Sequence, residues 1–170
     1  MRNLLDRFFQ ALLYLAALAM VATLLTILLG VAGREFHFDL PGLDAYAGYS
    51  IAAALFLALP ATLRNGDHIR VTLLLGKLRG TPRKMLDYWC LGAATCLSFY
   101  LAWYAARLVY VSYVSHDISG AADATPLWIP QLAMVVGAFG LALAFAEDLL
   151  LKLAGEEVNV EPAAEMARTE

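Results

Sequence analysis

The histidines, cysteines and serines of this 170-residue chain are the side chains that could carry chemistry, and their spacing argues against a reactive site. Cys90 and Cys96 lie six residues apart in one apolar run, so as helical residues they point to different sides and cannot bridge each other. The serines have no histidine and aspartate partners in a catalytic arrangement, and a glycine-rich phosphate-binding loop is absent. Apolar runs long enough to cross a membrane place His68 on the opposite side from His37 and His116, so the three histidines cannot form one metal site. We therefore expect no enzyme activity, no cofactor and no metal.

The composition assigns the chain to the membrane. Hydrophobic residues make up 61% of it and charged residues 16%, whereas an average soluble domain is about half apolar and about a quarter charged. A domain of this size cannot bury such an apolar surplus in one core. The net charge of −3 excludes a strongly basic protein that binds nucleic acid.

Four uncharged runs have the length of membrane spans. Cutting the sequence at its charged residues leaves runs at 8–33, 45–63, 88–106 and 124–146. A bilayer core of roughly 30 Å needs about 20 helical residues, and every run supplies about that number. The sequence thus predicts an all-α integral membrane protein with four transmembrane helices, at about 8–33, 45–63, 88–106 and 127–146.

These spans are expected to form one domain, 1–155, followed by an acidic tail, 156–170, that is predicted to be disordered. The first run exceeds the apolar region of a cleaved signal peptide, which is usually about 7 to 15 residues, so we expect an uncleaved anchor.

The basic residues predict the orientation. Ten of the 12 lysines and arginines lie before the first run, between the second and third, or after the fourth. Cytoplasmic loops carry an excess of Lys and Arg, so both termini are expected in the cytoplasm.

The basic segment between the second and third runs, 64–87, contains the pattern of a further short helix. Val71, Leu74, Leu75 and Leu78 have the spacing of one apolar helix face, behind Asp67 as a potential cap. A short amphipathic helix lying in the inner interface and an inward extension of the second span both fit this pattern.

The spans themselves carry no Asp, Glu, Lys, Arg or His. A charge at mid-bilayer costs roughly 2.5–3.5 kcal/mol on insertion scales, so chains keep one there for a task such as ion or substrate binding. This chain alone is therefore not expected to transport anything. Small residues recur at the spacing of helix contacts, and either internal packing or a partner explains them. They include Gly48 with Ala52, Gly92 with Cys96, and Gly137 with Gly140.

Three segments together resemble a known family. They are Leu40-Pro41-Gly42-Leu43-Asp44, Leu63-Arg64-Asn65-Gly66-Asp67-His68-Ile69-Arg70-Val71, and Thr125-Pro126-Leu127-Trp128-Ile129-Pro130. The pattern is similar to that of the small membrane subunit of tripartite ATP-independent periplasmic (TRAP) transporters, the DctQ-like family, over roughly 34–150. The family usually shows one or two glutamates ahead of the second span, where the nearest acid here is Asp44.

The resemblance implies a function and a set of partners. It implies a scaffold in a bacterial or archaeal cytoplasmic membrane, packed against the large TRAP membrane subunit that carries sodium and an organic acid. A periplasmic binding protein would deliver the substrate and touch the complex transiently, and membrane lipids would surround it. Two alternatives remain: a stand-alone homo-oligomeric exporter or channel, and a membrane anchor of a redox complex.

Seven residues are candidate contacts with these partners or with lipid. On this interpretation Arg64, His68 and Arg70 would orient the inner loop against lipid phosphate or the large subunit, with generic anchoring as the alternative. Arg34 and Arg107 are basic on the outer side, where they would pair with partner acids or extend to headgroups. The remaining two candidates are Asp44, in the place of the family's glutamates, and Trp128, in the outer aromatic belt.

Overall fold

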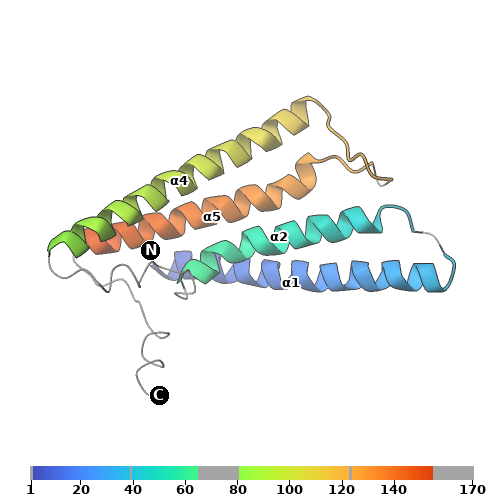
Figure 1. Cartoon of the computed structure of the whole chain (residues 1–170), viewed down its shortest axis with the longest axis horizontal. Helices are drawn as coiled ribbons and strands as arrows, with labels where there is room; N and C mark the ends of the chain where they lie inside the picture. The colour runs from blue at the N-terminus through green and yellow to red at the C-terminus, as the bar shows by residue number, and fades with distance from the viewer. Residues whose placement is uncertain (1, 39, 65–80, 123, 155–170) are drawn as a thin grey trace, which may run out of the picture.

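The computed structural model describes residues 2–38, 40–64, 81–122 and 124–154, which form four α-helices (Figure 1). The helices are α1 (Arg2–Glu35), α2 (Leu43–Arg64), α4 (Thr81–Val114) and α5 (Trp128–Leu153). All four are long and apolar enough to cross a membrane, which confirms the predicted all-α fold with four spans. The chain runs up and down, so α1 begins and α5 ends at one end of the molecule. We call this the terminal end, and the opposite one the far end.

The helices extend beyond the uncharged runs on which the prediction was based. The third run stops at Ala106, but α4 continues through Arg107 to Val114. The fourth run stops at Ala146, but α5 continues past Glu147 and Asp148 to Leu153. A charged residue ends an uncharged run without ending a helix, because a helix backbone accepts Arg and Glu readily. The apolar face predicted for a short helix, Val71 to Leu78, and the tail 156–170 lie outside the described residues.

The helices lie side by side in the order α1–α2–α5–α4 (Figure 1). The most extensive contacts join α1 to α2, α2 to α5 and α4 to α5. The two central helices bury more of their most apolar stretch than the two outer ones. In that stretch 28% of the residues of α2 and 33% of those of α5 are buried, against 17% in both α1 and α4. The central pair therefore supplies most of the internal packing, while α1 and α4 form the two edges.

The contact between α2 and α5 depends on a proline and two glycines. Pro60 lacks an N–H, which leaves the carbonyl of Phe56 without its helical hydrogen bond. Gly137 of α5 lies against that carbonyl, so closely that any Cβ would overlap it. One turn further on, a Cβ at Gly140 would come within 2.8 Å of the Pro60 ring and of Leu12 in α1. Glycine at both positions thus permits the close helix approach that drives association in lipid.

A small apolar core surrounds this contact toward the terminal end. Its members come from α1, α2 and α5, which it joins into one unit. They are Phe9, Leu12, Ala16, Leu57, Leu63, Leu141 and Ala144.

Two histidines end helices at the far end. His37 and His116 follow α1 and α4 with φ of 56° and 52°, the left-handed conformation that commonly terminates a helix. The amide of Phe38 then donates back to the carbonyl of Gly33 at 3.0 Å, and the equivalent bond after His116 has the same length. Both histidines therefore serve as helix terminators, on exposed turns.

Gly137→Ala should destabilise the chain, because the added methyl forces α5 away from Phe56. Overpacking typically costs about 1–3 kcal/mol, and 1 kcal/mol moves the unfolding midpoint of a chain this size by about 2–4 °C. Thermal unfolding of the purified chain in detergent measures the shift. Gly48→Ala is the control, because a Cβ there meets nothing within 4 Å and alanine favours the helix. Equal destabilisation by both substitutions would contradict the proposed close approach.

Candidate functional site

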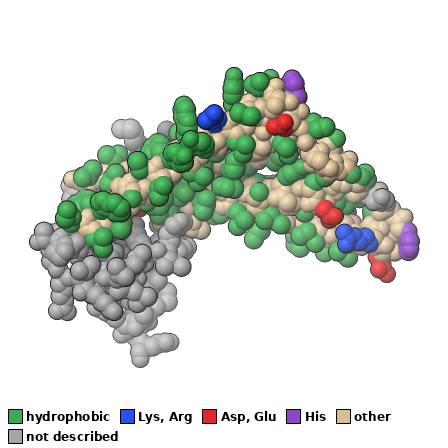
Figure 2. Space-filling model, turned by 45° about the horizontal axis from the view of Figure 1, so that its top comes forward, with side chains coloured by type: hydrophobic (Ala, Val, Ile, Leu, Met, Phe, Trp, Pro, Cys, Tyr) green, Lys and Arg blue, Asp and Glu red, His purple; other side chains and the backbone are tan. Residues whose placement is uncertain are grey.

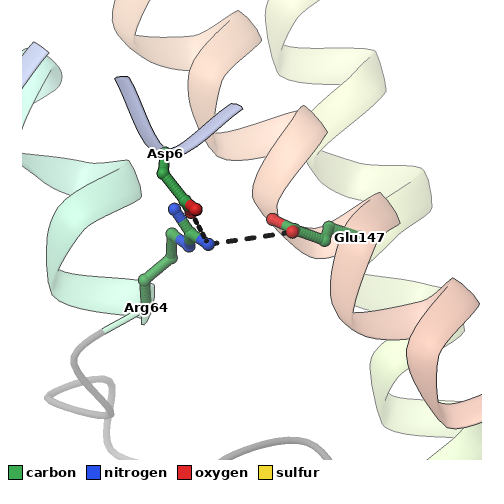
Figure 3. Close-up of polar contacts among 3 residues, drawn as sticks. All are labelled: Asp6, Arg64 and Glu147. Carbon is green, nitrogen blue, oxygen red and sulfur yellow. Dashed lines mark hydrogen bonds and ion pairs between the residues drawn. The ribbon is translucent and has the colours of Figure 1, made fainter. Parts of the chain in front are cut away.

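A cluster of charged residues at the terminal end connects three helices (Figure 3). The Nη2 atom of Arg64 donates to Oδ1 of Asp6 at 2.7 Å and lies 3.7 Å from Oε1 of Glu147. Its guanidinium also sits over the ring of Phe9, 4.6 Å from the centroid. One side chain at the end of α2 thus contacts both α1 and α5 at the terminal end of the molecule.

The helices position these groups favourably. Arg64 is the last residue of α2, where the helix dipole favours a cation. Asp6 lies in the second turn of α1, at the same end of the molecule. The side chain of Arg64 is 32% exposed, that of Asp6 45% and that of Glu147 17%. The cluster is only partly open to solvent, so its attraction is less screened than that of a surface pair.

The pair α4 and α5 has its own connection at the same end. The hydroxyl of Tyr88 donates to the backbone carbonyl of Lys152 at 3.1 Å, and the Lys152 ammonium lies 5.4 Å from the centre of the Tyr88 ring. Tyr88, the first residue of the third uncharged run, thus joins the start of α4 to the end of α5.

The segment between α4 and α5 folds back onto α2 at the far end. The Tyr46 hydroxyl and Thr125 Oγ1 are 3.2 Å apart, which joins the start of α2 to this segment. Within the segment, the amide of Ser119 donates to the carbonyl of Thr125 at 2.8 Å. Trp128 is half-buried and meets Tyr113 edge to face, with ring centroids 5.8 Å apart. The candidate residue Trp128 therefore packs the first turn of α5 against the end of α4.

Arg34 and Asp44 face each other across the turn between α1 and α2. Their nearest charged atoms are 3.7 Å apart, and the two side chains are 79% and 93% exposed. A pair so open to solvent contributes little stability. Beside it lies an open hollow of about 440 Å³, lined by Gly30, Pro41 and neighbouring residues of the turn. The structure thus leaves both charges accessible at the far end. Figure 2 shows acidic and basic side chains on the surface there.

The other candidates are separate from these contacts. Arg107 is exposed on α4, and among the described residues it has no ion-pair partner. His68 and Arg70 lie outside the described residues. Within the described part of the chain, no three histidine, cysteine or acidic side chains gather as metal ligands, and Cys90 and Cys96 are both free.

Sequence reasoning missed most partners in these contacts. Asp6, Glu147 and Tyr46 were not among the candidate residues, and only their contacts in three dimensions give them a role. Gln131, in the first turn of α5, was also missed. Its Oε1 is buried and has no hydrogen-bond partner among the described atoms.

Arg64→Ala should lower stability more than Arg34→Ala. The first substitution removes a partly buried ion cluster and the contact with Phe9, whereas the second removes one exposed pair. Cation–π contacts contribute roughly 0.5–1 kcal/mol at exposed sites and ion pairs a similar amount, so we expect a loss of about 2–6 °C in the unfolding midpoint. Differential scanning fluorimetry in detergent compares the two variants, and a larger loss for Arg34→Ala would contradict the assigned roles.

The comparisons with known proteins agree with this architecture. No curated protein matches the chain. A family profile does match, over residues 23–155, which is most of the chain and includes parts or all of the four helices. Its description is "Tripartite ATP-independent periplasmic transporters, DctQ component". The chain therefore belongs to the DctQ family, the small membrane component of TRAP transporters.

Proposed function

We propose that this chain acts as a scaffold, which packs beside the large TRAP membrane subunit and supports transport without conducting the cargo itself. The observation that carries the proposal is the uncharged middle of each span. No Asp, Glu, Lys, Arg or His lies between Arg7 and Arg34, between Asp44 and Arg64, or between Asp87 and Arg107. In α5 the first charged residue is Glu147, in the last two turns. Ion and substrate paths ordinarily use such groups at membrane depth.

The packing of the helices supports the same proposal. The closest internal contact, between α2 and α5, is filled by glycines, Pro60 and apolar side chains. The charged cluster around Arg64 lies at the terminal end, where it fastens helices to each other. The polar contacts among the described residues thus hold the layer together, and its edge helices α1 and α4 keep exposed faces that can add to a larger membrane protein.

The finer parts of the proposal follow from membership in the family. The large subunit would carry sodium and an organic acid, which a periplasmic binding protein delivers. The complex would lie in the cytoplasmic membrane of a bacterium or archaeon, with both termini of this chain in the cytoplasm. The far end, with Arg34, Asp44 and the segment before Trp128, would then face the periplasm and be available to the binding protein.

Transport should require the other two components. Liposomes that contain only this chain should show no sodium-driven uptake of an organic acid, because its spans offer no group to bind ion or substrate. Liposomes with both membrane subunits and the binding protein should take up the acid on a sodium gradient. Uptake is measured with radiolabelled candidate acids, and a reversed sodium gradient is the control. Robust uptake by this chain alone would contradict the proposed scaffold.

Reporter fusions test the orientation. A green fluorescent protein fused after Glu170 should fluoresce, because it folds in the cytoplasm. Alkaline phosphatase inserted after Gly120 should be active, because it needs the oxidising periplasm. The basic residues at the terminal end are the physical reason, through the positive-inside rule. The opposite pattern, an active phosphatase at Glu170, would show that the topology is inverted.

A further inference from the structure

The edge helix α4 exposes a face whose chemistry does not suit lipid tails. Its side chains Trp103 and Tyr100 are 71% and 61% exposed. Among the four spans α4 is the least hydropathic and α1, the other edge, the most. The exposed large side chains of α1 are almost all aliphatic, which matches hydrocarbon. The two edges of the layer are therefore chemically different.

Four exposed residues of α4 and one glycine with free space around its Cα form one stripe, which we call the α4 stripe. They are Gly92, Cys96, Tyr100, Trp103 and Arg107. Their spacing of four, four, three and four residues places them on one side of the helix. Because Gly92 has nothing within 4 Å of a built Cβ and the other four are exposed, this side faces away from α5.

Tyrosine hydroxyls lie on this face near the middle of the span. Tyr100 is about 18 Å from Tyr88 and about 21 Å from Val114 along the helix, at ~1.5 Å per residue. Its ring lies 4.4 Å from that of Tyr104. Two hydroxyls bring two donors, so even a bond between them would leave one donor unused. The second donor has no acceptor among the described residues, and hydrocarbon supplies none.

Arg107 adds a charge to the same stripe. It lies seven residues before the end of α4, about 10 Å along the axis. No acidic side chain pairs with it in the described part of the chain. An acidic residue on an adjoining helix, near the far-end boundary, would complement this charge.

The small residues of the stripe differ from those inside the layer. Gly137 and Gly140 are used internally, since a Cβ at either would collide with α2 or α1. Gly92 has the same type of spacing, four residues before Cys96, but opens outward. Small residues at this spacing allow a second helix to approach closely.

We infer that the α4 stripe is the surface that seats the large TRAP membrane subunit. The occupant is an apolar transmembrane helix of that subunit. It packs against Gly92 and Cys96, accepts a hydrogen bond from the tyrosine pair at mid-depth, and offers an acidic side chain to Arg107. The inference rests on the proposed function, and it assigns α1 to lipid.

Two substitutions by leucine provide a test and its control. Gly92→Leu places a large side chain in open space on the α4 stripe, and Ala11→Leu places one at an exposed position of α1. Each variant is tagged, co-expressed with the large subunit and purified in mild detergent, and the recovered large subunit is quantified. We expect Gly92→Leu to reduce recovery about tenfold, which corresponds to roughly 1.4 kcal/mol of binding, and Ala11→Leu to reduce it less than about twofold.

The results separate this inference from the proposed function. Full recovery with Gly92→Leu would show that lipid covers the α4 stripe, and loss only with Ala11→Leu would move the interface to α1. Either result overturns the inference and leaves the scaffold intact. Failure of the unmodified chain to recover any large subunit overturns the proposed function as well. Size-exclusion profiles of the isolated variants check that each one folds.

The native cysteines give a second measurement that needs no bulky substitution. Cys90 and Cys96 are both exposed in the isolated chain, and they lie about 120° apart around α4. A membrane-permeant maleimide should label both in the isolated chain. In the complex, mass spectrometry should find Cys96 protected at least about fivefold, because it lies under the partner helix, and Cys90 still labelled. Unchanged labelling of Cys96 would overturn the inference.

Discussion

The structure depends on the close approach of α5 to α2 at Pro60. The proline leaves the Phe56 carbonyl without a helical donor, and Gly137 brings the backbone of α5 against that exposed carbonyl. Since the most extensive contact of α1 is with α2 and that of α4 is with α5, this approach joins the two helical hairpins into one layer. Arg64 and Tyr46 then fasten its two ends. A protein without a large core is held by a few close backbone contacts and by polar connections at the membrane boundaries.

Much of the fold could be predicted from the sequence, because the bilayer imposes strong rules on length and charge. Four uncharged runs of about 20 residues predicted four helices, and the described part of the chain has four. The helices extend beyond these runs, because Arg107 and Glu147 end uncharged runs but lie inside helices. His37 and His116 are instructive in another way: left-handed helix ends favour glycine, so a histidine there carries no sequence signal.

The contacts between helices could not be predicted. Gly92 and Gly137 occur at similar spacings, and only the structure shows that one opens outward and the other contacts Phe56. Arg64 was identified as a candidate from its motif, but its partners lie 58 and 83 residues away in the chain. Such pairings depend on the order of helices in the layer, which the hydrophobic pattern does not encode.

A layer of four helices with exposed edges and uncharged centres is suited to enlarging another membrane protein. On the proposed function, this chain needs no transport site of its own, because its contribution is surface and rigidity. The α4 stripe and the aliphatic face of α1 give its two edges different roles, one toward protein and one toward lipid. The two edges of the layer are therefore not interchangeable within the membrane.

The most direct measurement of the central claim is an electron cryo-microscopy map of the assembled complex with sodium and substrate bound. The account predicts that every ligand of the ion and of the cargo comes from the large subunit, with α4 of this chain against it. A sodium ion or cargo coordinated by residues of α1, α2, α4 or α5 would contradict it.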